Sequence, residues 1–296
     1  MSARLQMSVR FRTSVRLCAC LSAPLLLAGC RQPGREPELM SYEEYGRAPR
    51  EFPYILASTA GRGRLLYIGT RHFFDPADPQ AALIGTLWNE FRPTLAFNEG
   101  GNPPTLASAS EAIARYGEPG LVRHLAARDG VPVRNIEPPE AEIAAALTGA
   151  GHTAAEVKLF LVLLAYDSQR RARSDETAEQ FITRALRIES LTPGLEGPPN
   201  NLDEFAALYD ELFPLGPGWR EVPREWFAPT CTDTLLNRCA RRMSQYRDRH
   251  MVNVLADAVA RGERVFAVVG GSHTVMQEAA LRSRVPALTR RAVAAR

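Results

Sequence analysis

Short apolar runs alternate with helical patterns over much of the chain. Residues 64–68 ("RLLYI") form an apolar run of strand length, and residues 79–91 follow with apolar positions at helical spacing. The expected strands are 64–68, 94–97, 131–136 and 264–269, and the expected helices between the first three are 79–91, 105–116 and 119–128. Strands that alternate with helices over short connections are typical of parallel βαβ units. We therefore expect an α/β fold with a mixed, mainly parallel central sheet and flanking helices.

A long helical region interrupts this alternation after residue 139. Breaks rich in Gly and Pro at 192–200 and 214–223 divide the region into separate helices. The expected helices are 139–148, 153–173, 175–189, 201–213 and 232–261, after which the strand 264–269 and a helix near 274–283 resume the α/β pattern. We therefore expect one domain, residues 54–296, with a large helical insertion at about 139–261.

The beginning of the chain has the pattern of a lipoprotein signal. Four arginines and no acidic residue precede an apolar run from Leu17 to Ala28, which continues into "LLAGC" at residues 26–30. This ending resembles a bacterial lipobox, in which the cysteine is acylated and becomes the first residue of the mature chain. The alternatives are a cleavable signal that ends near a cysteine and a single anchor helix, but a run of about 12 residues is too short to span a bilayer. We expect residues 1–29 to be a lipoprotein signal peptide and Cys30 to carry acyl chains such as palmitate.

The segment after the signal predicts where the domain works. Residues 30–53 are polar, rich in Pro and Glu, and without apolar periodicity, which is typical of a flexible tether. The expected partner is membrane lipid, through the acyl chains on Cys30. We therefore expect a lipid-anchored protein of the bacterial cell envelope, with its domain outside the cytoplasm. Arg31, rather than an aspartate, follows Cys30 and favours the outer membrane.

The charge of the mature chain excludes one class of partner. The full chain has 36 Lys and Arg against 33 Asp and Glu. Without the four arginines of the leader, 32 basic residues face 33 acidic ones, and the formal net charge becomes −1. There is also no basic stretch interleaved with aromatic residues. We therefore expect no nucleic-acid partner.

Three of the five cysteines remain after processing. Cys30 is the lipidation candidate, which leaves Cys231 and Cys239 in an oxidising compartment. Along one straight helix the last two would lie roughly 12 Å apart, which is too far for a disulfide. A bridge therefore requires Cys231 to precede the helix and fold back, and Pro229 makes this feasible. A disulfide and two buried free thiols remain the two alternatives.

Each expected strand of the parallel sheet ends in a polar cluster. The clusters are "GTRH" (69–72), "NEGG" (98–101), "EPP" (137–139) and "GGSH" (270–273). In an open parallel sheet the functional crevice lies outside the carboxyl ends of the strands. His72, Glu99 and His273 are therefore expected at one edge of the sheet, with Glu137 as a lesser candidate. Histidine and carboxylate together suit a divalent metal such as Zn, Mn, Co or Fe.

These residues resemble the motifs of the TraB/TIKI (GumN-like) family, within the superfamily of ChaN-like and erythromycin-esterase-like proteins. That pattern has two Gly-x-x-His motifs, which 69–72 and 270–273 match, and a glutamate at the end of the second strand, which Glu99 matches. It also has an arginine in the helix before the last motif, and Arg249 in "YRDRHM" matches it. The correspondence covers roughly residues 62–283.

The resemblance implies a mixed α/β fold with a divalent metal held by His72, His273 and Glu99. It implies a membrane-anchored hydrolase of peptide or ester bonds, in which a metal-bound water attacks the carbonyl and Glu99 is either the third ligand or the general base. Arg249 or Arg71 would then stabilise the oxyanion. Relatives also include esterases that do not depend on metal, which leaves open a site with His72 as base and Glu99 orienting it. A haem- or metal-binding lipoprotein of the ChaN type and a decayed enzyme that only scaffolds partners are the remaining alternatives.

Overall fold

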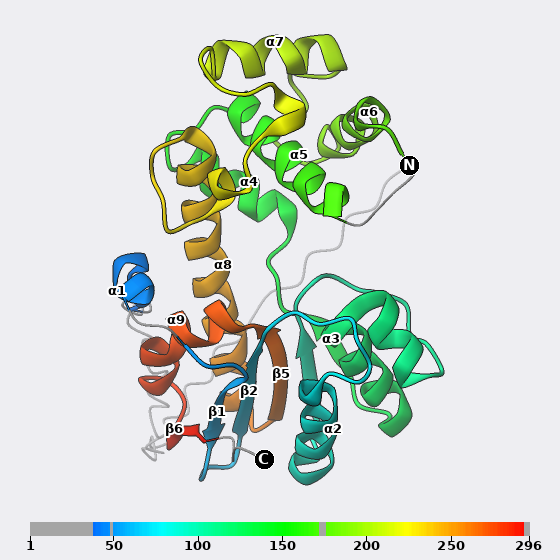
Figure 1. Cartoon of the computed structure of the whole chain (residues 1–296). Coiled ribbons are helices and arrows are strands. Elements are labelled where there is room, and N and C mark those ends of the chain that lie inside the picture. The colour runs from blue at the N-terminus through cyan, green and yellow to red at the C-terminus, as the bar shows by residue number, and fades with distance from the viewer. Residues whose placement is uncertain (1–37, 48–49, 172–175, 293–296) are drawn as a thin grey trace, which may run out of the picture. The chain divides into compact units, whose positions relative to one another are not determined.

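The computed structural model of the chain describes residues 38–47, 50–171 and 176–292 (Figure 1). These residues contain a six-stranded mixed sheet in the order β4-β3-β5-β2-β1-β6. The strands are β1 (Tyr54–Ser58), β2 (Arg64–Thr70), β3 (Leu95–Asn98), β4 (Val133–Asn135), β5 (Arg264–Gly270) and β6 (Leu288–Arg291). The predicted fold class, α/β with a mainly parallel sheet, is confirmed.

The parallel part of the sheet consists of the four strands that the apolar pattern predicts. β2 and β3 each pair parallel with β5, and β4 pairs parallel with β3. β1 and β6 extend the sheet by antiparallel pairing, and they are absent from the expectation. β6 has a single buried residue, Leu288, so its sequence carries almost no alternation that would reveal a strand.

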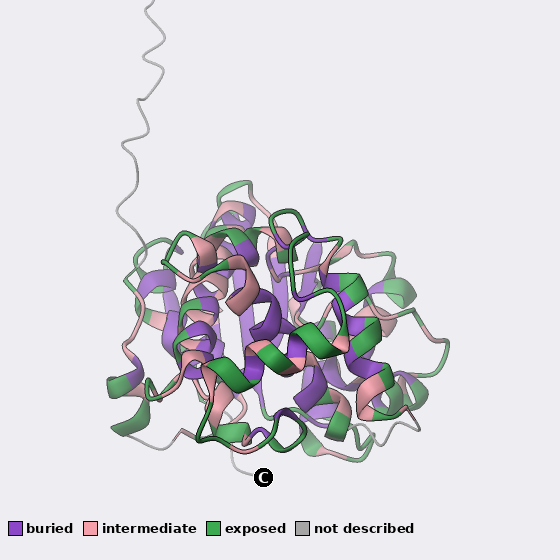
Figure 2. Cartoon of the chain, turned by 90° about the horizontal axis from the view of Figure 1, so that it is seen from above, coloured by how far each residue is buried: buried purple, intermediate pink, exposed green. Residues whose placement is uncertain are grey.

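Helices cover both faces of the sheet. The flanking helices are α2 (Pro79–Phe91), α3 (Ala109–Asp129), α8 (Leu235–Ala260) and α9 (Gly271–Arg282). On one face α2 and α3 pack on side chains such as Leu66 and Ile68, and on the other α8 and α9 pack on Leu65 and Tyr67. β2, β3 and β5 are therefore buried on both sides (Figure 2), which explains why they read as continuous apolar runs.

The helical insertion between β4 and β5 has a core of its own. It contains α4 (Glu140–Thr148), α5 (Ala154–Arg171), α6 (Ala178–Glu189), α7 (Leu202–Leu212) and the 3₁₀ helices η1 (Trp219–Glu221) and η2 (Arg224–Phe227). These helices begin and end close to the expected positions. The long helix α8 joins the two cores, because Leu236 and Cys239 pack in the insertion while Met251 and Leu255 pack against the sheet.

Part of the segment expected to be a flexible tether packs on helices α8 and α9. Residues 42–47 form α1 (Tyr42–Arg47), and the Tyr42 side chain is buried. The Arg241 guanidinium of α8 lies 5.1 Å from the centre of the Tyr42 ring, and the Met40 amide donates to the Met276 carbonyl oxygen of α9 at 2.9 Å. Residues 40–42 are therefore held on α8 and α9.

The predicted signal peptide, residues 1–29, and the lipidation candidate Cys30 lie outside the described residues. Among the helices that are described, none combines the length and the apolar character needed to cross a membrane.

Candidate active site

The two Gly-x-x-His motifs lie side by side although two hundred residues separate them. β2 and β5 are parallel neighbours, with Thr70 opposite Gly270 in the register. β3 borders β5 on its other side, with Asn98 opposite Val268. The residues that follow these three strand ends, His72, Glu99 and His273, therefore come from adjacent strands at the same edge of the sheet.

His72 is paired with a buried glutamate that the sequence analysis does not single out. The Nδ1 atom of His72 lies 2.5 Å from Oε1 of Glu118 on α3. The Glu118 side chain is 4% exposed, whereas that of His72 is 66% exposed. The Thr70 hydroxyl also donates to Glu118, at 3.1 Å. The hydrogen bond with Glu118 raises the pKa of His72 above its ordinary value. Glu118 therefore holds the His72 ring at Nδ1, while most of the His72 side chain stays exposed to solvent.

An interruption in α3 turns Glu118 toward the sheet. Gly117 has a φ of +63°, which breaks the helical path inside α3. A Cβ at Gly117 would lie 2.8 Å from the Phe73 carbonyl oxygen, so any other residue would collide with the loop that carries His72. The expected helices end at 116 and resume at 119, so the sequence does mark this break. The sequence does not show, however, that the Glu118 side chain at this break points toward the sheet.

His273 is held by a buried chain of hydrogen bonds. Its Nδ1 lies 2.7 Å from Oδ1 of Asp248 on α8, and its Nε2 lies 3.3 Å from Oε1 of Glu99. The Gln277 amide also donates to Asp248, at 2.7 Å, and accepts from the Tyr67 hydroxyl at 2.9 Å. Burial opposes the charged imidazole, but the carboxylates of Glu99 and Asp248 outweigh it and raise the pKa of His273 to about 10.

Glu99 lies between His273 and an arginine of α8. Its Oε1 accepts from Nη2 of Arg247 at 2.7 Å, and its Oε2 accepts from the Gly270 amide at 2.6 Å. Arg247 also donates to Glu137 at 2.5 Å. Burial opposes ionisation of Glu99, but the His273 charge and these donors hold its pKa well below the usual range.

The predicted residues meet around Gly270. A Cβ built on Gly270 would lie 3.1 Å from Nε2 of His72 and 3.4 Å from Oε2 of Glu99. The glycine of the second motif therefore leaves the space into which the imidazole of the first motif reaches. We name the assembled group the edge cluster: His72, Glu99, Glu118, Glu137, Arg247, Asp248 and His273.

Three arginines lie in or near the edge cluster. Arg247 of α8, which the sequence analysis does not single out, makes an ion pair with Glu99. Arg249 lies two residues further along α8 and is partly buried, and its role in stabilising an oxyanion stays a prediction. Arg71 is exposed next to His72.

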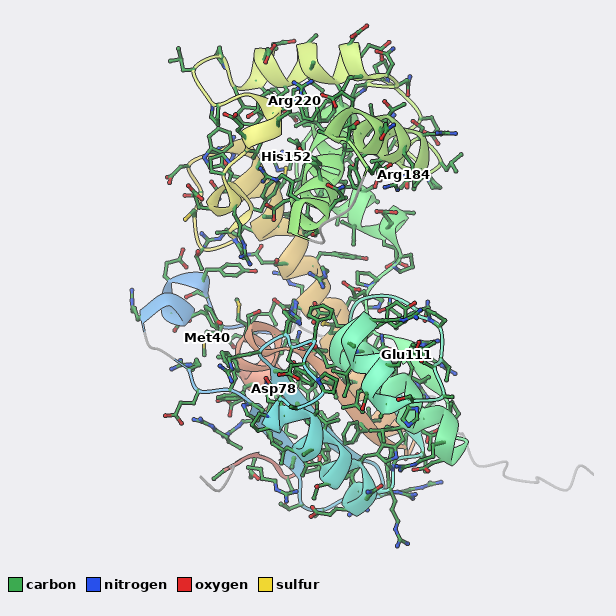
Figure 3. The ribbon with its side chains drawn as sticks, turned by 45° about the vertical axis from the view of Figure 1, so that its right-hand side comes forward. Met40, Asp78, Glu111, His152, Arg184 and Arg220 are labelled. Atoms are coloured by element: carbon green, nitrogen blue, oxygen red, sulfur yellow. The ribbon has the colours of Figure 1, made fainter. Side chains whose placement is uncertain are left out.

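In the part of the chain that the structure describes, no hydrogen bond or ion pair joins the remaining histidines to this cluster. His152 is in the helical insertion, between α4 and α5 (Figure 3). Nδ1 of His124 lies 2.9 Å from the Leu106 carbonyl oxygen, and Nδ1 of His250 lies 3.9 Å from Glu142. That these three residues are structural or at the surface stays a prediction.

The donor atoms of the expected metal site are bonded to protein partners. Within residues 38–47, 50–171 and 176–292, no group of three His, Cys, Asp or Glu side chains is arranged to hold a metal ion. Both oxygens of Glu99 accept from protein donors, and Nε2 of His273 faces Glu99. As arranged, these residues do not fit a metal. The divalent metal and the haem stay predictions, and no step proposed below depends on either.

Cys231 and Cys239 are free thiols in the structure. Cys239 is fully buried in the core of the insertion, and burial raises the pKa of its thiol to about 12. It is therefore protonated at neutral pH and unsuited to a nucleophilic role.

Comparison of the chain with models of known protein families, with curated proteins and with solved structures gives no match. The resemblance to the TraB/TIKI family therefore rests on the quoted motifs alone and stays a prediction.

Proposed function

We propose that this protein is a hydrolase of ester or peptide bonds in which His72 is the general base. The observation that carries the proposal is the pairing of an exposed imidazole with a buried carboxylate. Glu118 accepts a hydrogen bond from the Nδ1–H of His72, which leaves Nε2 as the basic nitrogen. A base held in one tautomer and orientation, on a side chain that is mostly exposed to solvent, is what proton abstraction from water requires.

The reaction assigned to this site is simple hydrolysis. Nε2 of His72 takes a proton from water as its oxygen attacks the substrate carbonyl. The same proton then passes from His72 to the departing alcohol or amine, so that one water molecule is consumed for each bond broken. Glu118 holds the imidazole and balances the charge that it carries between the two transfers.

Arg71 is the cation proposed to stabilise the oxyanion. It is exposed beside His72, whereas Arg247 is 14% exposed and already contacts two carboxylates. Arg247, Asp248 and Gln277 are assigned a positioning role, because they hold Glu99 and His273 and face the protein interior.

Hydrolysis of 4-nitrophenyl butanoate and of a fluorogenic peptide pool by the purified chain tests the proposal. We expect His72→Ala to lower kcat/KM about 100-fold or more, the range that removal of a general base typically costs. Glu118→Gln should act mainly on kcat and shift the lower limb of the pH profile, since it keeps the ring but removes the charge that holds it. His152→Ala is the matched control and should leave both substrates unaffected.

Two outcomes would contradict this proposal. One is a wild-type chain with no turnover above that of free imidazole, and the other is a His72→Ala variant as active as the wild type. A stoichiometric divalent metal in the wild type that is lost in Glu99→Gln would replace the metal-free mechanism by the metal-dependent one.

We also propose that Cys30 carries a lipid anchor and that the protein is in the cell envelope. Only the signal-like sequence at residues 1–30 supports this part of the proposal. A membrane-anchored hydrolase of this kind would act on molecules close to the lipid surface.

A further inference from the structure

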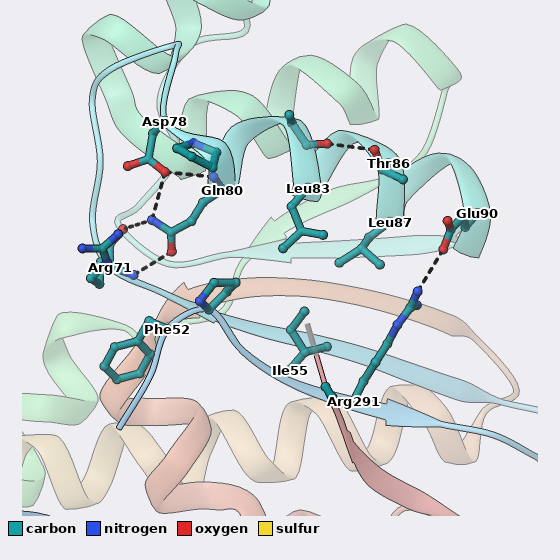
Figure 4. Close-up of a pocket in the computed structure, with 14 residues that line it drawn as sticks. Phe52, Ile55, Arg71, Asp78, Gln80, Leu83, Thr86, Leu87, Glu90 and Arg291 are labelled. Atoms are coloured by element: carbon teal, nitrogen blue, oxygen red, sulfur yellow. Dashed lines mark hydrogen bonds and ion pairs between the residues drawn. The ribbon is translucent and has the colours of Figure 1, made fainter. Parts of the chain in front are cut away.

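A groove runs along one side of α2, beside the loop that carries His72 (Figure 4). It has a volume of about 620 Å³, which lies in the range of small-molecule binding sites. Apolar side chains form most of its walls: Phe52, Pro53, Ile55, Pro79, Leu83 and Leu87.

The groove exists because the sheet is wider than the helices on that face. α2 packs over β2 and β5, while β1 and β6 extend the sheet beyond it. Ile55 of β1 and Arg291 of β6 are paired in the register and form the floor beside the helix. Leu83 and Leu87, four residues apart on α2, form the wall above them.

The two ends of the groove differ in charge. At one end Arg291 forms an ion pair with Glu90, with Nη2 3.2 Å from Oε2. These charges neutralise each other. Arg71 lies at the opposite end, near Phe52 and Asp78 (Figure 4).

Gln80 fixes Arg71 at that end. The Gln80 side chain is buried, accepts from the Arg71 amide at 3.0 Å and donates to the Arg71 carbonyl oxygen at 3.1 Å. The nearby acid, Asp78, is engaged as the N-cap of α2, where its Oδ1 accepts from the Gln80 amide at 2.8 Å. In the described part of the chain no carboxylate pairs with the Arg71 guanidinium. The open end therefore presents an unneutralised cation next to an apolar channel.

The groove ends one residue from the proposed base, although His72 itself is not among the residues that line it. Arg71 and His72 are consecutive, so their Cα atoms are about 3.8 Å apart. A molecule whose charged group pairs with Arg71 would place the bond beside that group within reach of His72.

We propose that this groove binds the hydrocarbon chain of an anionic single-chain amphiphile, and that the substrate is an acyl ester of this kind. The chain lies between α2 and β1, the negative group pairs with Arg71, and the ester next to that group faces His72. This assignment of the substrate rests on the proposed hydrolase function, whereas binding in the groove can be measured without turnover.

Binding of dodecanoate to the purified chain, measured by calorimetry, tests the groove. Dodecan-1-ol, which has no ester bond to be cleaved, is the neutral probe of the same chain length. We expect Leu83→Trp, which fills the groove, to weaken both probes at least tenfold. Arg71→Gln should weaken dodecanoate about tenfold, the usual cost of losing a charge-assisted contact, and leave the neutral probe within twofold.

The matched controls are Leu191→Trp and Arg115→Gln, at exposed positions away from the groove, and neither should change binding. Equal dodecanoate affinity in the wild type and in Leu83→Trp would overturn the proposal. So would equal effects of Arg71→Gln on both probes, because the charge would then play no part.

Comparison with His72→Ala separates this inference from the proposed function. If His72→Ala binds dodecanoate like the wild type and the wild type cleaves dodecanoyl esters at least tenfold faster than acetyl esters, both proposals are supported. If short esters are cleaved but dodecanoate does not bind, the hydrolase stands and the groove assignment is wrong. If dodecanoate binds but the wild type cleaves no ester, the hydrolase and the substrate assignment both fall.

Discussion

The edge cluster and the polar centre of the helical insertion contain similar groups but differ in their access to solvent. In the edge cluster, Glu118 and Asp248 are buried, yet the histidine paired with Glu118 is mostly exposed. In the insertion, Lys158 is fully buried, and its Nζ donates to the Gly197 carbonyl oxygen at 2.8 Å and to Asn200 at 2.9 Å. Glu189, also buried, lies in the same region.

The difference separates a reactive arrangement from a structural one. Both regions shift pKa values: burial lowers that of Lys158, and contact with Glu118 raises that of His72. A shifted pKa therefore does not tell the reactive region from the structural one. The two regions differ in access to solvent. The His72 side chain of the His72–Glu118 pair is exposed, whereas Lys158 is buried and donates its hydrogen bonds to other protein groups.

The largest expected effect on stability is in the buried part of the edge cluster. Arg247→Met leaves Glu137 without the cation it contacts and Glu99 with His273 alone, and we expect the free energy of unfolding to fall by about 3–5 kcal/mol. Ester hydrolysis should fall as well, since Glu99 and His273 lose their position. Arg115→Met removes an exposed ion pair on α3 and should cost under about 1 kcal/mol by urea titration. A cost for Arg247→Met no larger than that control would show that the pair is not structural.

A smaller loss is expected in the insertion, without loss of activity. Lys158→Met preserves the length of the side chain but removes the donor to the Gly197 carbonyl oxygen and one of the two donors to Oδ1 of Asn200, which should cost about 2–3 kcal/mol. Hydrolysis by the folded variant should equal that of the wild type. A folded Lys158→Met protein with impaired hydrolysis would remove the functional distinction between the two regions.

The smallest effect depends on pH. Burial and the neighbouring Glu140 raise the pKa of Glu189 from its ordinary value of 4.5 to about 7. Between these values the folded chain holds a proton that the unfolded chain has released, so wild-type stability falls as pH rises through this window. Glu189→Gln stays neutral, and we expect it to gain roughly 2 kcal/mol over the wild type at pH 8 but little at pH 4.5. Melting temperatures at the two pH values check this, and Glu140→Gln should flatten the wild-type slope in part. A pH-independent difference between Glu189→Gln and the wild type would contradict the assignment.

Much of the sheet could be predicted because three of its parallel strands, β2, β3 and β5, are buried on both faces. Their apolar runs stand out between helical patterns, and parallel pairing places the residues after each run at one edge. This is why His72, Glu99 and His273 could be grouped from their positions alone. β6 escaped prediction because only one of its side chains is buried.

The partners of the two histidines could be found only in part. Asp248 lies on the face of α8 that also carries Met251 and Val252, at helical spacings of three and four, so a carboxylate on an apolar stripe was a visible signal. Glu118 follows a glycine and precedes a proline, which marks a break in α3 but gives no direction.

The order of apolar and polar positions was enough to establish the α/β class, the helical insertion and the placing of two histidines and a glutamate at strand ends, because these depend on local periodicity. Which carboxylate holds which histidine, which arginine reaches Glu99 and where the sheet extends beyond α2 depend on contacts between residues far apart in the chain. His72 and Glu118 are 46 positions apart, and Arg247 and Glu99 are 148 apart. Such pairs follow from strand order and helix packing, which no local pattern encodes.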